Sequence, residues 1–150
     1  MANVTSILNN LIETSKDGEK GFRTSADDVK DPELKQIFSR RADDCARGAQ
    51  ELQAIVSRLG EEPDEGGSVS GAVHRGWMNL KAAVTGEDDL AILEECERGE
   101  DVARAAYRKA LEDNDLPSDI RVVVQKQYDG VVHNHDQVRN LRDRLRATRH

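Results

Sequence analysis

Hydrophobic residues recur along the chain at the three- and four-residue intervals that are typical of amphipathic α-helices. In the first segment this pattern predicts a helix over residues 3–30. Further stretches with the same period predict long helices over residues 33–59, 87–114 and 118–147. The apolar positions of the first predicted helix are Val4, Ile7, Leu8, Leu11, Ile12, Phe22, Ala26 and Val29.

Residues that stop or start helices separate these segments. Asp31-Pro32 is predicted to end the first helix, because the α-helical backbone conformation is disfavoured for a residue that precedes proline. Proline itself is common in the first turn of a helix, so a second helix can begin there. Pro117 similarly marks the turn between the last two helices, and Gly60 ends the second helix. The two tight turns predict two antiparallel helical hairpins. Residues 60–68 form a linker, and helical spacing over about 69–85 predicts a short fifth helix in the crossover between the hairpins.

These elements predict an all-α fold: a four-helix bundle of two antiparallel hairpins, joined by one long crossover connection. The length of 150 residues suits a single domain covering residues 1–150. The composition agrees, because 37% hydrophobic and 34% charged residues with 3% aromatic residues suit long amphipathic helices better than strands.

Charge and composition also narrow the classes of partner. A net charge of −7 argues against nucleic acid, whose recognition needs a basic surface. The sequence has neither an apolar run of membrane-spanning length nor a signal peptide at its start. Two cysteines fit neither a disulfide framework nor a zinc signature. We therefore expect a cytoplasmic protein with no nucleic-acid or membrane partner; a homodimer or an unidentified protein partner stays open.

Some charged residues fall on or beside the apolar faces of the predicted helices. Glu19, Arg41, Glu100 and His135 come to one level when the two hairpins are folded at their turns, which predicts a polar layer at mid-bundle. Ionised groups in a core must be paired or bound to a metal, because desolvating them alone costs several kcal/mol. Glu97 flanks the inner face of its helix.

Two interpretations of this layer stay open. Glu19, Glu97, Glu100 and His135 are candidate metal ligands, since carboxylate and imidazole groups suit iron and other divalent ions. The alternative is a structural network of ion pairs and hydrogen bonds in which Arg41 and Gln127 take part.

Other residues near this layer have simpler predicted roles. Glu95 and Arg98 are expected on the solvated face of the third long helix. Cys45 and Cys96 are expected to be buried small hydrophobic residues, with thiol ligands or a redox pair as the alternative. On the predicted crossover helix, Trp77, with His74 near its edge, is expected to anchor the helix onto the bundle, with a binding surface as the alternative.

Four segments, DGEKGF (17–22), HRGWMNLK (74–81), EECERGED (94–101) and NHD (134–136), resemble a bacterial ferritin-like family of unknown function. The resemblance covers nearly the whole chain. It implies the ferritin-like fold, and for some relatives an association with stress responses, but it implies no settled activity.

The ligand pattern departs from that of the di-iron members of this fold. Those use one Glu from each of two helices and Glu-x-x-His from the other two. Here Val132 stands three residues before His135, and Arg47 stands three residues after Asp44. The sequence therefore favours a non-catalytic ferritin-like bundle without catalytic residues or an organic cofactor. The alternative is a protein that binds iron or another divalent metal and has ferroxidase or oxidase chemistry.

Overall fold

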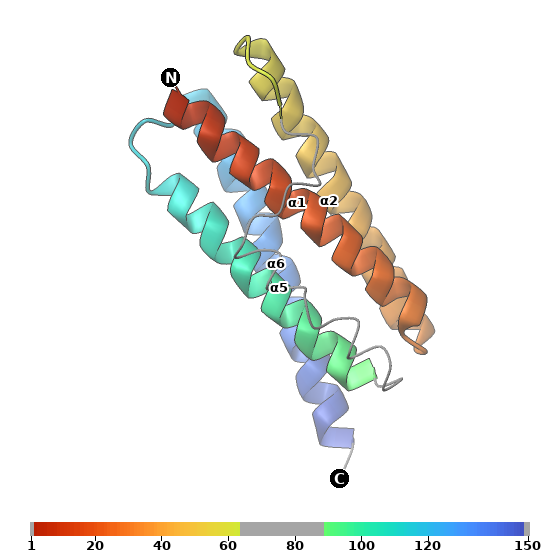
Figure 1. Ribbon diagram of the computed structural model, residues 1–150. Helices are drawn as coiled ribbons and strands as arrows, with labels where there is room; N and C mark the ends of the chain where they lie inside the picture. The colour runs from red at the N-terminus through yellow and green to blue at the C-terminus, as the bar shows by residue number, and fades with distance from the viewer. Residues whose placement is uncertain (1, 64–88, 149–150) are drawn as a thin grey trace.

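The computed structural model describes residues 2–63 and 89–148, and over these residues the chain forms four long α-helices (Figure 1). They are α1 (Ala2–Asp28), α2 (Pro32–Arg58), α5 (Asp89–Leu111) and α6 (Ser118–Thr148). The all-α prediction is confirmed, and most helix ends lie within two residues of the predicted ones. The third long helix ends at Leu111, three residues before the predicted end. The predicted fifth helix, with His74 and Trp77, lies outside the described residues.

The helices pair as two antiparallel hairpins, α1 with α2 and α5 with α6, as the tight turns predicted. The hairpins meet mainly through α1 and α5, whereas α2 and α6 approach each other at few points. α2 ends and α5 begins at opposite ends of the bundle, so these two helices run in the same direction (Figure 1). The weak contact between α2 and α6 leaves room for an opening on that side.

The turn between α1 and α2 is fixed by two aspartates. Asp31 is the N-cap of α2: its carboxylate accepts a hydrogen bond from the amide of Glu33 at 2.9 Å, and Pro32 occupies the first turn. Asp89, at the start of α5, accepts from the backbone amides of Lys30 at 2.9 Å and Asp31 at 3.1 Å. These contacts link the first hairpin to the second.

Backbone groups at the end of α2 and at the turn between α5 and α6 are also hydrogen-bonded. Just after α2, Gly60 has a φ of +80°. Its amide donates to the carbonyl of Ser57, and the amide of Glu61 donates to the carbonyl of Val56. This is the left-handed stop that glycine favours. At the turn into α6, Arg121 donates to the carbonyls of Leu111 and Asp113, and so neutralises the negative end of α5.

The core is divided into two hydrophobic clusters, one toward each end of the bundle. The first cluster contains Val4, Leu8, Leu11, Ile12, Leu52, Ile55, Val56, Tyr107, Ala110, Leu116, Ile120, Val124 and Val131. The second contains Phe22, Ala26, Val29, Leu34, Phe38, Ala42, Cys45, Ile92, Leu93, Cys96, Val138 and Leu141. In each helix, polar and glycine residues lie between the two sets, so a polar layer crosses the middle of the bundle.

One predicted orientation is wrong. Glu95, expected on the solvated face, is only 8% exposed, and its carboxylate pairs with Arg98 at 3.1 Å. Glu95 lies next to Cys96, which is completely buried, so a small rotation of α5 relative to the expected face is enough to cover it. Within the described residues, no helix has both the length and the apolar character that a membrane span requires.

Candidate functional site

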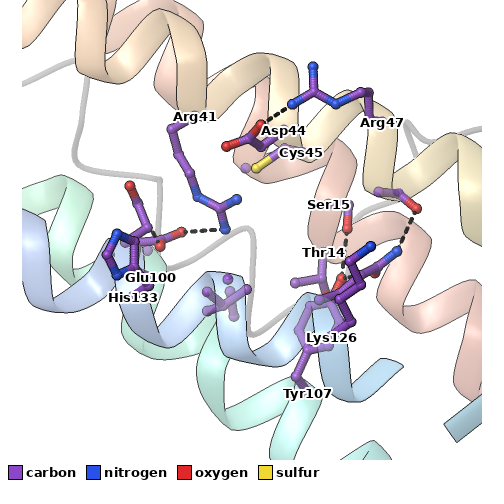
Figure 2. A pocket seen from close by; sticks show the side chains of 18 of the residues that line it. Thr14, Ser15, Arg41, Asp44, Cys45, Arg47, Glu100, Tyr107, Lys126 and His133 are labelled. Atoms are coloured by element: carbon purple, nitrogen blue, oxygen red, sulfur yellow. Dashed lines mark hydrogen bonds and ion pairs between the residues drawn. The ribbon is translucent and has the colours of Figure 1, made fainter. Parts of the chain in front are cut away.

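A cavity of about 470 Å³ lies at mid-bundle, where α2 and α6 separate, and residues from all four described helices line it (Figure 2). We call it the mid-bundle cavity. Arg41 reaches into it from α2 toward Glu100 on α5, while Ser15 and Tyr107 stand at its other end (Figure 2). The cavity lies between the two hydrophobic clusters, so its walls combine apolar packing with buried polar groups.

Arg41 is the central cation of this site. Its guanidinium lies 5.8 Å from the centre of the Phe22 ring, within the range of a cation–π interaction. Its Nη2 donates to Oε1 of Glu100 at 3.5 Å, a long contact for a charged pair. Its Nε is buried and has no hydrogen-bond partner within the described residues. The guanidinium therefore keeps unused capacity to donate hydrogen bonds.

Glu100 is the central anion. It is 1% exposed, and its second oxygen, Oε2, accepts a hydrogen bond from Nδ2 of Asn134 at 2.8 Å. Burial disfavours the charge of Arg41, but its attraction to Glu100, its hydrogen bond to that carboxylate and smaller contributions from Cys45 and Tyr107 together raise the pKa of the guanidinium. Arg41 and Glu100 thus form a buried ion pair, with Asn134 completing the hydrogen bonds of the carboxylate.

A hydrogen-bonded chain forms the other end of the cavity. The hydroxyl of Ser15 lies 3.1 Å from that of Tyr107, which donates to Oε1 of Gln127 at 2.8 Å. Nε2 of Gln127 donates to Glu51 at 2.8 Å and to the carbonyl of Gly48 at 3.3 Å. Burial raises the pKa of Tyr107 to about 12, so its hydroxyl stays protonated and can act as a donor at neutral pH.

Small residues shape the wall between these two ends. A Cβ on Gly18 would lie 3.1 Å from Sγ of Cys45, so the glycine allows α1 and α2 to approach closely. Burial raises the pKa of Cys45 to about 12, and Cys45 and Cys96 are both free and buried. The prediction that both cysteines are buried is confirmed. A thiol that keeps its proton is a poor nucleophile, so Cys45 contributes packing to the wall.

His135 belongs to a separate group beside the cavity, between α5 and α6. It is 4% exposed; its Nε2 lies 2.6 Å from Oδ1 of Asp101 and 3.9 Å from Oε2 of Glu97. Glu97 also forms an ion pair with Arg142 across the two helices. On its other side, Nδ1 of His135 lies 3.4 Å from Asp136. The imidazole is thus held by carboxylates from its own helix and from its neighbour.

The structure brings the predicted metal ligands together only in part. Glu97 and His135 are neighbours, Glu100 faces Arg41, and Glu19 pairs with Arg23 at 3.2 Å on the surface of α1. Each of the three carboxylates is therefore held by an arginine. Over residues 2–63 and 89–148, no group of three or more His, Cys, Asp or Glu residues is arranged to hold a metal ion. The described donor residues do not fit a di-iron centre.

The membership of the mid-bundle layer differs from the expected one. Glu19 pairs with Arg23 at the surface, and His135 lies beside the cavity. Asn134 bonds to Glu100, and Ser15 and Tyr107 line the far end of the cavity. The sequence carried a signal for this cavity. Each of the four described helices has a glycine at the level of the polar layer that lines the cavity: Gly18, Gly48, Gly99 and Gly130. Glycine in a helix interior costs about 1 kcal/mol relative to alanine, so such a group indicates close approach or open space.

A family model described as "Domain of unknown function (DUF2383)" matches residues 3–113, about three quarters of the chain. The match includes α1, α2 and α5, and hence Arg41, Glu100 and Tyr107. No curated protein matches the sequence.

Proposed function

The chain belongs to the DUF2383 family, and from that premise we propose that it is a non-catalytic bundle of the ferritin-like fold, in which an arginine–carboxylate pair stands at the mid-bundle position. The observation that carries the proposal is the buried pair of Arg41 and Glu100. Bundles build their metal and ligand sites from side chains that face one another in the core. Here a guanidinium takes the place of a divalent cation as the positive partner of the buried carboxylate.

The arrangement of the helices supports the ferritin-like part of this proposal. Two antiparallel hairpins in which α2 and α5 run in the same direction are the arrangement of a bundle with one long crossover connection. The polar layer at mid-bundle, with carboxylates of α5 near groups of α6, has the position of the metal site in di-iron bundles. As part of the same proposal, we extend to this chain the link with stress responses that its ferritin-like resemblance implies.

The charges around the layer support the absence of redox metal chemistry. A metal ion at Glu100 would have to displace or repel the guanidinium of Arg41, which lies 3.5 Å from that carboxylate and is itself buried. Two cations that share one buried carboxylate repel each other strongly at low dielectric constant. Glu97 would likewise have to release Arg142. Metal binding therefore requires two ion pairs to be broken first.

The test is elemental analysis of protein purified without chelators, then loaded anaerobically with Fe(II) and desalted. We expect far less than one retained iron per chain, with no difference between the wild type and the variants Glu100→Gln and His135→Gln. One or more retained iron atoms per chain, lost in either variant, would overturn the proposal in favour of an iron-binding protein with oxidase chemistry. Asp136→Asn is a suitable control, because it changes a surface carboxylate beside His135 that was not a predicted ligand.

A further inference from the structure

We propose that the mid-bundle cavity binds a small organic monocarboxylate, whose carboxylate accepts hydrogen bonds from the guanidinium of Arg41 and whose apolar body extends toward Tyr107. The volume of about 470 Å³ lies within the range of small-molecule pockets, about 300–1,000 Å³. Four helices contribute to its walls, so a bound ligand would contact both hairpins.

The hydrogen bonds that are already made determine what kind of group the cavity can accept. Several of its acceptors already have donors: both oxygens of Glu100, Oε1 of Gln127, which accepts from Tyr107, and one oxygen each of Asp44 and Glu51. In contrast, Nε of Arg41 is a buried donor with no partner in the described part of the chain. A ligand that brings an acceptor relieves this unsatisfied donor, whereas a ligand that brings only donors leaves it unsatisfied.

The charges at the cavity favour an anionic acceptor. Guanidinium and carboxylate match in geometry and form charge-assisted bonds about twice as strong as neutral ones. Lys126 and His133 line the cavity and make no ion pair with any other described residue. Asp44 and Glu51 also line it, but they are bonded to Arg47 and Gln127. Figure 2 shows Arg41 with one side toward Glu100 and the rest of the guanidinium facing the space between α2 and α6. The ligand should carry no more than one negative charge, because it shares Arg41 with the Glu100 carboxylate and each further negative charge adds repulsion.

The remaining wall favours a compact apolar body. Gly18, Cys45, Gly48 and Ala103 line the cavity between Arg41 and Tyr107. The Cys45 thiol keeps its proton, and the three other residues have no polar side chain. A short aliphatic chain or a single aromatic ring would cover these small residues. A ligand with a second charge would have to bury it against them without a partner, which is costly.

The test compares a carboxylic acid with its neutral amide. Benzoate, butanoate and hexanoate are titrated into the full-length protein at neutral pH, and benzamide serves as the matched neutral probe for benzoate. Binding is measured by calorimetry and by the shift of the Arg41 Nε–H signal in side-chain ¹H–¹⁵N spectra. We expect saturable binding of at least one acid, a shift of the Arg41 signal, and binding of benzamide at least about tenfold weaker than that of benzoate.

Variants identify the residue that holds the ligand. Arg41→Met should weaken acid binding by about tenfold to a hundredfold, as expected for the loss of hydrogen bonds to a charged group. If that variant does not fold, Arg41→Lys, which keeps the charge but not the two-pronged geometry, should still weaken binding about tenfold. Arg23→Met, at an arginine outside the cavity, should leave it unchanged.

A second readout uses the two cysteines. Cys45 lines the cavity and Cys96 does not, so a bound acid should slow the labelling of Cys45 more than that of Cys96. Three results would overturn the proposal: no saturable binding of any of the three acids, equal binding of benzoate and benzamide, or acid binding that is unchanged in both Arg41 variants.

Discussion

Removing the charge of Arg41 should leave Glu100 without a cationic partner in the middle of the bundle. Arg41→Met keeps a long apolar side chain against Phe22 but leaves the carboxylate with Asn134 as its remaining hydrogen-bond donor. Glu100 is 1% exposed, so it would carry a buried charge without a cation beside it. Breaking a buried pair in this way costs about 3–5 kcal/mol.

The distance in the structure gives a similar magnitude. At the observed 3.5 Å and an effective dielectric constant of about 20, Coulomb's law gives about 5 kcal/mol for the attraction that is lost. The retained hydrogen bond from Asn134 and the cavity beside Arg41 reduce this loss, because both help to solvate the carboxylate. We therefore expect the free energy of unfolding to fall by about 3 kcal/mol, the lower end of the range for a broken buried pair.

The assay is urea denaturation followed by helical circular dichroism at neutral pH. The double variant Arg41→Met/Glu100→Gln removes both charges while its amide oxygen can still accept from Asn134, so it should recover to within about 1 kcal/mol of the wild type. Arg23→Met, which breaks the exposed pair with Glu19, should cost about 0–1 kcal/mol. An Arg41→Met protein as stable as the wild type, or a double variant no more stable than Arg41→Met, would show that Glu100 does not depend on Arg41 for its charge balance.

Three further predictions concern stability. Asp31→Ala should lower the free energy of unfolding by about 1 kcal/mol in urea titrations, because α2 loses its N-cap bond; an unchanged midpoint would contradict this. Gly130→Ala should raise it by about 0.5–1 kcal/mol, since a Cβ there meets open space within a helix; a lowered midpoint would contradict this. Burial raises the thiol pKa of Cys45 and Cys96 to about 12. The stabilisation that each protonated thiol gives the folded state is therefore fully present below about pH 8.5. As the pH rises toward 12, the free energy of unfolding falls by up to about 1.4 kcal/mol per pH unit for each thiol. Replacing either by alanine should flatten this alkaline decline, and an equally steep decline would contradict it.

The helices were predictable because two features of the sequence agree along most of the chain. Apolar periodicity gives the buried face of each helix, and Asp31-Pro32, Gly60 and Pro117 interrupt it where the helices end. The end of α5 was predicted three residues late, because Arg121 from α6 covers its last carbonyls and no local residue marks the stop.

The pairing of charges at mid-bundle was harder to predict. Periodicity shows which face a residue occupies, but not which partner a long side chain reaches. Glu19 has Arg23 one turn away on its own helix, and that local pair forms at the surface. His135 contacts Asp101 and Glu97 because α5 and α6 are adjacent, whereas Arg41 reaches Glu100 across the bundle. Which of these pairs form depends on side-chain rotamers and on the distances between helices. Neither can be read from the spacing of residues in the sequence.

The most direct test of the central claim is a crystal structure of the protein grown at neutral pH with a manganese salt, with anomalous scattering recorded. We expect the Arg41 guanidinium within hydrogen-bonding distance of Glu100 and no anomalous peak between Glu97, Glu100 and His135. A manganese ion bound by these residues, with Arg41 turned away from Glu100, would contradict it.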